Sequence, residues 1–341
     1  MRVAEWATPH VQKWHRERNL NRNEAQRHLE ARNWSEAEKH FHVALAERQH
    51  STVDRLELLL GLAEAERRQG KLAEAERNVC DSVKIAVREE NETMHSLALE
   101  ALANVQLDQQ RYEDAEKSAR EVIRLETTRA KPDHARLASC SRKLASALEK
   151  SDRPAEAIGA LKSAVSHAEK AFGGEHADTA VHLQELGILH RRHGHHAAAQ
   201  ACFRRAIMIH RKVQADSQEA TETLYHLAGS LEESGDLHGA EAEFEKMLAL
   251  RERQIGANPT ETAVAQVRLA ALHLRTGRLS SARELLTRAL PTLERKGGPM
   301  LAQALETLAS AEERMGRGDQ ARQYREKAMV EAALHAAEAG K

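Results

Sequence analysis

The chain has 341 residues, of which 30% are charged and 3% are aromatic, and its formal net charge is −1. So few aromatic residues argue against a β-sandwich or an α/β enzyme core, whereas many charges suit a well-solvated helical protein. Acidic and basic residues are interleaved, which argues against a nucleic-acid partner. No apolar stretch is long enough to cross a membrane and the first residues are charged, so we expect a cytoplasmic protein that does not bind membranes.

Alanines recur every 38 to 42 residues along the chain, and a second small residue stands 12 positions before each of them. The first set, which we call the anchor alanines, comprises Ala37, Ala75, Ala115, Ala157, Ala199, Ala240, Ala282 and Ala321. The preceding small residues are Ala25, Ala63, Ala103, Ala145, Gly187, Ala228, Ala270 and Ala309. A nearly constant period of this length is the signature of a repeat protein. The sequence therefore predicts eight copies of one structural unit.

Each copy predicts a pair of helices. In the fifth copy, Leu183 and Leu186 precede the anchor at helical spacing, and Phe203 follows it by four residues. In five copies a glycine lies five residues before the anchor, where a helix end favours a left-handed residue; these are Gly70, Gly194, Gly235, Gly277 and Gly316. We call the helix before this position helix A and the helix after it helix B. The unit is therefore an antiparallel hairpin.

Three local signals predict where helix B begins. Ser35 precedes Glu38, and Ser281 precedes Glu284, at the spacing of a capping box. Pro154 fits the first turn of a helix, where its missing N–H is not needed.

The residues before the first repeat contain two tryptophans. Thr8 and Pro9 predict the start of a helix, so residues 1–17 are expected to be an N-terminal extension of the first helix A. Trp14 lies on the packing face of that helix, where it either caps the first hairpin or anchors a partner or a second copy. Residues 18–341 predict one solenoid of eight repeats, the last ending in a capping helix.

The fifth repeat resembles the tetratricopeptide repeat, and its period near 42 is similar to that of the long repeats in kinesin light chains. The matching residues are Leu183, Leu186, Gly187, His190, Gly194, Ala199, Phe203 and Ala206, preceded by a Gly-x-x-His linker in which Ala177 replaces the usual proline. The resemblance implies an all-α, right-handed superhelical solenoid of antiparallel hairpins that binds protein or peptide partners in its concave groove.

Kinesin-type repeats carry paired asparagines on helix A that hold an extended peptide. In the two corresponding columns of this chain only Asn23 matches, so the sequence does not predict kinesin-like cargo recognition.

Stacked hairpins of this kind curl so that helix A lines the inner wall, and the polar residues of helix A in repeats 4 to 7 are therefore the candidate partner-binding residues. They are Arg142, Lys143, Gln184, Glu185, Tyr225, His226 and Arg268. Tyr225, the aromatic residue of this set, is the expected packing anchor, and the three Arg and Lys side chains are expected to receive carboxylates. The alternative interpretation is a solvated polar surface without a partner.

No catalytic motif is present. The chain lacks a phosphate-binding loop, a nucleophile elbow and a zinc-peptidase motif. The densest group of metal-type ligands is His190, His193, His195 and His196; it has no acidic or cysteine ligand beside it, so we predict no metal, although its capacity to bind one stays open. We therefore expect no cofactor and no enzyme activity. A non-catalytic scaffold or adaptor is predicted, with a peptide-sensing signalling receptor as the alternative; a homo-oligomer is neither indicated nor excluded.

Overall fold

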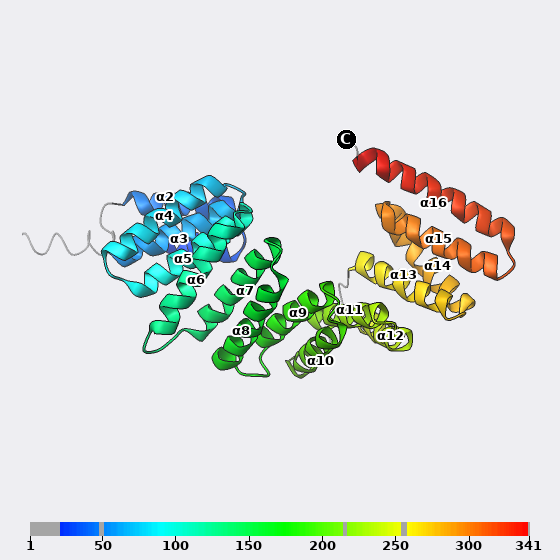
Figure 1. The fold of residues 1–341 in the computed structure, drawn as a ribbon. Coiled ribbons are helices and arrows are strands. Elements are labelled where there is room, and N and C mark those ends of the chain that lie inside the picture. Colours follow the sequence, from blue (N-terminus) through cyan, green and yellow to red (C-terminus); the bar gives the residue numbers. More distant parts are fainter. Residues whose placement is uncertain (1–20, 48–50, 214–216, 254–257, 340–341) are drawn as a thin grey trace, which may run out of the picture. The chain divides into compact units, whose positions relative to one another are not determined.

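The computed structural model describes residues 21–47, 51–213, 217–253 and 258–339. Within these residues all regular structure is helical, and consecutive helices pair as hairpins (Figure 1). No helix in this part of the chain is both long and apolar enough to cross a membrane. The predicted all-α class and the repeated hairpins of a tetratricopeptide-like solenoid are confirmed.

The chain separates into two compact units, Met1–Gly174 and Glu175–Lys341, which we call unit 1 and unit 2 and describe each by itself. The prediction of one continuous right-handed solenoid over residues 18–341 therefore stays a prediction. The expected N-terminal extension, with Trp14, lies outside the described residues.

Unit 1 begins with a helical stretch at residues 21–30, whose Ala25 packs in one apolar cluster with Ala37 and Phe41 of the next helix. The following helices are α2 (Trp34–Ala46), α3 (Thr52–Arg68), α4 (Leu72–Arg88), α5 (Glu92–Asp108), α6 (Tyr112–Thr128), α7 (His134–Lys150) and α8 (Pro154–Phe172). Each even-numbered helix is the helix B of its hairpin.

Unit 2 repeats the same arrangement. Its helices are α9 (Ala177–Arg192), α10 (His196–Val213), α11 (Gln218–Glu233), α12 (Leu237–Arg253), α13 (Pro259–Arg275), α14 (Leu279–Lys296), α15 (Pro299–Arg314) and α16 (Gly318–Ala339).

The small residues form the crossing points of the hairpins, as predicted. Every anchor alanine and every alanine that precedes one is at most 2% exposed. In the fifth repeat the preceding residue is Gly187, and a Cβ atom there would lie 2.6 Å from the Phe203 ring. Glycine at this position therefore lets the aromatic ring pack directly on the backbone of α9.

A left-handed residue ends helix A in all eight repeats. The five predicted glycines have positive φ, and the other copies place Arg32, Gln110 and Asp152 at the same position with φ of 59°, 60° and 57°. In the third repeat, for example, the Arg111 N–H donates to the Gln106 carbonyl at 2.8 Å, which closes the helix end. The turn geometry thus holds even where glycine is absent.

The capping-box prediction for helix B is wrong, whereas Pro154 does occupy the first turn of α8. α2 begins at Trp34 and α14 begins at Leu279, so Ser35 and Ser281 lie inside their helices. The reason is that the left-handed turn already sets the start of helix B. The Glu38 carboxylate instead accepts a hydrogen bond from the side chain of Lys71 in the next repeat.

Ion pairs join neighbouring hairpins at a fixed position of the repeat. In four repeats the residue directly after the anchor alanine is a glutamate. Its carboxylate contacts the Lys or Arg side chain that stands four residues before the next anchor alanine. These pairs are Glu38 with Lys71, Glu76 with Arg111 and Glu116 with Arg153 in unit 1, and Glu241 with Arg278 in unit 2.

Candidate functional site

The predicted groove residues lie in both units, so they are described in two groups. Arg142 and Lys143 belong to α7 of unit 1. The Lys143 ammonium lies 2.6 Å from the Glu100 carboxylate and 2.8 Å from the Ser139 hydroxyl, and its side chain is 9% exposed. Lys143 therefore has a carboxylate partner within unit 1, while Arg142 is exposed.

Gln184 and Glu185, two of the five predicted groove residues in unit 2, lie on α9 and contact neighbouring side chains. The Thr223 hydroxyl donates to Gln184 Oε1 at 2.6 Å, which joins α11 to α9. Glu185 Oε2 lies 3.8 Å from Nδ1 of His182 on the same helix.

Tyr225 and Arg268, two of the predicted groove residues, contact each other. The Tyr225 ring packs edge-on against Phe244, with 6.0 Å between ring centroids. The Arg268 guanidinium lies 5.3 Å from the centroid of the Tyr225 ring, within range of a cation–π interaction. Arg268 also lies 3.7 Å from Glu232. These contacts hold the tyrosine ring in place on α11.

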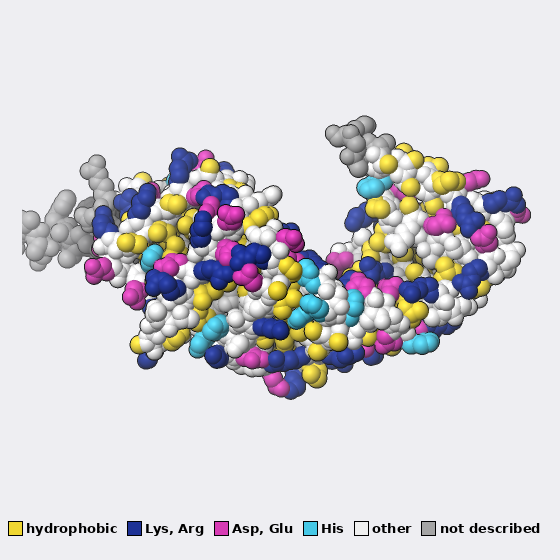
Figure 2. Space-filling view, viewed as in Figure 1, with side chains coloured by type: hydrophobic (Ala, Val, Ile, Leu, Met, Phe, Trp, Pro, Cys, Tyr) yellow, Lys and Arg dark blue, Asp and Glu magenta, His cyan; other side chains and the backbone are white. Residues whose placement is uncertain are grey.

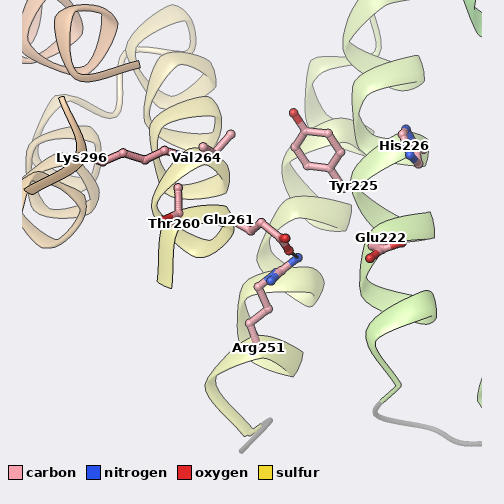
Figure 3. Close-up of a pocket in the computed structure, with 8 residues that line it drawn as sticks. All are labelled: Glu222, Tyr225, His226, Arg251, Thr260, Glu261, Val264 and Lys296. Atoms are coloured by element: carbon pink, nitrogen blue, oxygen red, sulfur yellow. Dashed lines mark hydrogen bonds and ion pairs between the residues drawn. The ribbon is translucent and has the colours of Figure 1, made fainter. Parts of the chain in front are cut away.

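Tyr225 lines a cavity of about 420 Å³ that α11, α12, α13 and α14 form together (Figure 3). Its lining residues are Glu222, Tyr225, His226, Arg251, Thr260, Glu261, Val264 and Lys296. Cavities of about 300 to 1,000 Å³ that combine apolar surface with a few fixed polar groups are typical binding sites. The cavity lies entirely within unit 2.

The polar groups of this cavity differ in how firmly they are held. Arg251 is 6% exposed, its Nη2 donates to Glu261 Oε2 at 2.8 Å, and its Nε is buried without a hydrogen-bond partner in the described residues. Lys296 is exposed and forms no ion pair with any described residue. Tyr225 and Val264 provide apolar surface in the same cavity, and Val264 lies beside Lys296 (Figure 3). A ligand would thus meet a fixed ion pair and one unpaired ammonium.

His226 is neutral at pH 7. Burial, and then the nearby guanidinium groups of Arg191, Arg192 and Arg268, lower its pKa to about 4. Its ring also stacks on Phe203, with 5.8 Å between centroids. His226 can therefore donate or accept a hydrogen bond in the cavity, but it does not act as a cation there.

Arg251 and Lys296 were missed because the prediction considered helix A alone, and both residues lie on a helix B. A signal for Arg251 was present in the sequence. It stands 11 residues after its anchor, in a column of buried positions that other repeats fill with Ala86, Glu126, Ala168, His210 and Leu293. A charged side chain in a buried column needs a partner.

The histidine group of the fifth repeat surrounds the turn between α9 and α10. His190 is buried, and its Nδ1 lies 3.4 Å from Nδ1 of His195, whereas His193 and His195 are exposed.

Two other groups of three side chains bring ligand atoms within 4.8 Å of one another in the described part of the chain. They are Glu38, His42 and Glu66 in unit 1, and Glu241, Glu245 and His273 in unit 2. In each group a basic side chain from the following turn, Lys71 or Arg278, already contacts a carboxylate.

The sequence comparison with family profiles identifies one family. Tetratricopeptide repeat profiles match residues 22–89, 94–170, 140–212 and 219–295. No curated protein sequence matches the chain.

Several solved structures share the fold. A signal-transduction ATPase with a tetratricopeptide repeat sensor from Pyrococcus horikoshii has a TM-score of 0.71 at 15% identity, covering 94% of this chain and 48% of its own. The apo quorum sensor NprR from B. thuringiensis has a TM-score of 0.60 at 13% identity, covering 96% and 92%. BtubC from P. vanneervenii has a TM-score of 0.57 at 18% identity, covering 65% and 89%.

Identities this low show the fold alone, but the repeat profiles cover well over half of the sequence and coincide with the observed hairpins. The chain therefore belongs to the tetratricopeptide repeat family.

Proposed function

We propose that the protein is a non-catalytic scaffold or adaptor, and that unit 2 binds a protein or peptide partner at the cavity around Tyr225. Tetratricopeptide repeats typically bind such partners. The observation that carries the proposal is the arrangement of the cavity: a fixed aromatic ring and Val264 line it together with the Arg251–Glu261 ion pair and Lys296, which forms no ion pair with a described residue.

This arrangement suits an extended segment of polypeptide. An apolar side chain of the segment would pack on Tyr225 and Val264, because a rigid aromatic residue binds with little loss of side-chain entropy. The Lys296 ammonium would attract a carboxylate. The Tyr225 hydroxyl, which has no hydrogen bond to a described residue, and the neutral His226 imidazole would bind backbone groups.

The test selects binders from a displayed peptide library and measures their affinity by fluorescence anisotropy. Tyr225→Ala is expected to weaken binding about tenfold or more, the usual effect of removing an aromatic anchor. Tyr112→Ala, which removes the half-buried tyrosine that begins α6 in unit 1, is the matched control and should leave the affinity unchanged. Equal affinities of the wild type and the Tyr225 variant would contradict the proposed site.

The alternative function, a peptide-sensing receptor, differs in what binding does to the chain. NprR is described as a quorum sensor, and the shared fold extends over 96% of this chain. Small-angle scattering separates the two functions: compaction on adding a selected peptide favours a receptor, whereas an unchanged scattering profile favours a scaffold.

A further inference from the structure

α10 is unusually basic for this chain. The sequence contains no Asp or Glu between Glu185 and Asp216, although acidic and basic residues are nearly equal in number overall. α10 itself carries Arg204, Arg205, Arg211 and Lys212 without an acidic residue. Dark blue side chains accordingly gather over α10 at the lower edge of the view in Figure 2.

Three residues form a stripe on the outer face of α10. Arg204, Met208 and Arg211 follow one another at spacings of four and three residues, so they share one side of the helix. All three are exposed, and Met208 is 60% exposed. Arg204 contacts the Gln200 side-chain oxygen at 3.5 Å, and neither arginine forms an ion pair with a described residue. The stripe thus presents two unpaired guanidinium groups on either side of an exposed apolar side chain.

The next helix B, α12, presents the opposite charges at the same positions of the repeat. Glu245, Ala249 and Glu252 stand 5, 9 and 12 residues after their anchor, as Arg204, Met208 and Arg211 do after theirs. All three residues of α12 are exposed. Glu245 has no ion pair with a described residue, although its carboxylate lies within 4.8 Å of ligand atoms of Glu241 and His273, and Glu252 pairs with the exposed Arg288 at 2.6 Å. Unit 2 therefore carries a basic stripe and a matching acidic stripe.

We propose that the outer faces of α10 and α12 form a dimerisation surface for a second copy of this chain. The two helices contribute to one apolar cluster and, as second helices of consecutive hairpins, run in the same sense. A two-fold axis between them and parallel to them places α10 of one copy on α12 of the other without a shift in register. Each arginine then faces a glutamate, and Met208 faces Ala249. By symmetry the same set of contacts forms twice.

The charges favour a second copy over other acidic partners. A nucleic acid or an anionic membrane would be attracted by Arg204 and Arg211 but repelled by Glu245 and Glu252 on the adjacent helix. Only a surface with the inverse pattern satisfies both stripes, and this chain carries that pattern itself. Two helix faces are small for a permanent dimer, which usually buries about 1,200 Å² or more in total. The dimer is therefore reversible and concentration dependent.

The first experiment is sedimentation equilibrium of the full chain from about 5 to 500 µM, the range in which small interfaces dissociate. The expected result is a monomer–dimer equilibrium whose Kd rises about tenfold between low and high salt, because the ion pairs are solvent-exposed. A wild-type chain that stays monomeric over the whole concentration range overturns the proposal. The same holds if the monomeric chain binds an acidic peptide, because the surface then binds a partner other than a second copy.

Charge reversal gives the sharper test. R204E/R211E makes both stripes acidic and E245R/E252R makes both basic, so each variant alone is expected to be monomeric. Mixed in equal amounts, the two are fully complementary and are expected to restore the dimer. R77E/K84E reverses two exposed charges on α4 of unit 1 and is the control that should dimerise like the wild type. Variants that dimerise unchanged, or a mixture that stays monomeric, contradict the proposal.

Discussion

The two units contain the same number of hairpins but join them differently. In unit 1 the helix B residue four positions after the anchor is small in the middle repeats, Val79 and Ala119, and inter-repeat ion pairs follow one another without interruption. In unit 2 the corresponding residues are Phe203 and Phe244, both fully buried. One repeat pattern thus supports two kinds of junction, one with a small residue and one with a buried phenylalanine, and Phe41 in the first repeat of unit 1 is also of the second kind.

The aromatic junctions of Phe203 and Phe244 support the candidate site in unit 2. A phenylalanine at the crossing needs an adjacent glycine or a ring to stack on, and Phe203 has both, in Gly187 and His226. Phe244 in turn supports the edge of Tyr225, which lines the cavity. In unit 1 the small Ala119 stands at the corresponding position, and Lys143 in the next helix A pairs with Glu100.

Among the substitutions that compare the two units, removing an aromatic side chain from a junction should have the largest effect on stability. Phe203→Ala is expected to destabilise unit 2 by about 3 to 5 kcal/mol, because it leaves a large cavity at a fully buried crossing. Val79→Ala, at the same position of the repeat in unit 1, removes less volume and should cost clearly less. Hydrogen exchange followed by mass spectrometry measures each unit separately. Equal losses of stability in the two variants would show that the phenylalanine contributes no more to its junction than the valine does.

Acid should destabilise unit 2 before unit 1. The pKa of His226 is lowered to about 4 by burial and then by the neighbouring arginines, whereas in the unfolded chain it is about 6.5. Between these values the unfolded state binds a proton that the folded state does not, so stability falls as the pH falls from about 6.5 to about 4 and levels off below. The loss is on the order of 3 kcal/mol.

Unit 1 has a buried carboxylate, Glu126, whose contribution to stability is also lost as the pH falls, but only at lower pH. Burial alone would raise its pKa, but hydrogen bonds from Arg136 and the Asp133 backbone N–H lower it overall. Its contribution to stability is therefore present above the ordinary glutamate pKa and is lost only as the pH falls through the lowered value. Unit-resolved hydrogen exchange at pH 7, 5.5 and 4.5 should show unit 2 opening first. His226→Gln should reduce this difference, while the exposed His193→Gln should not.

A single added methyl group should test the close packing at Gly187. Gly187→Ala places a Cβ atom 2.6 Å from the Phe203 ring and is expected to cost about 1 to 3 kcal/mol, measured by urea denaturation. Gly159→Ala in α8 is the matched control, because a Cβ there meets no atom within 4 Å. That control should be neutral or slightly stabilising, since alanine favours helix over glycine. A similar loss in both variants would point to backbone effects rather than to the ring.

The sequence predicted those features that recur in every copy. The buried anchors and the glycine turns repeat eight and five times, so chance variation at one position does not obscure them. It did not predict features that a single copy introduces. The left-handed conformation of Gln110 is an example, because glutamine does not signal a positive φ as glycine does. Arg251 lies on a helix that the groove argument left out, and the capping boxes failed because the left-handed turn already sets the start of helix B.

The smallest expected effect concerns strain in the turns, where the units differ again. All four helix A ends of unit 2 have glycine in the left-handed position, whereas unit 1 has glycine only at Gly70. A residue with a Cβ atom is disfavoured in this conformation by about 1 kcal/mol relative to glycine. Gln110→Gly is therefore expected to stabilise unit 1 by about 0.5 to 1 kcal/mol, less than the full strain because glycine also gains freedom in the unfolded chain.

The reverse substitution provides the matched control for this prediction. Gly70→Ala introduces a Cβ atom at φ of 79° without any contact within 4 Å, so any loss of stability comes from the backbone alone. It should lower the urea midpoint of unit 1, while Gln110→Gly raises it. If Gln110→Gly instead lowers the midpoint, its side chain contributes more through contacts than the left-handed backbone takes away. Side-chain contacts would then compensate for the left-handed backbone in the turns of unit 1, and backbone strain would not distinguish the two units.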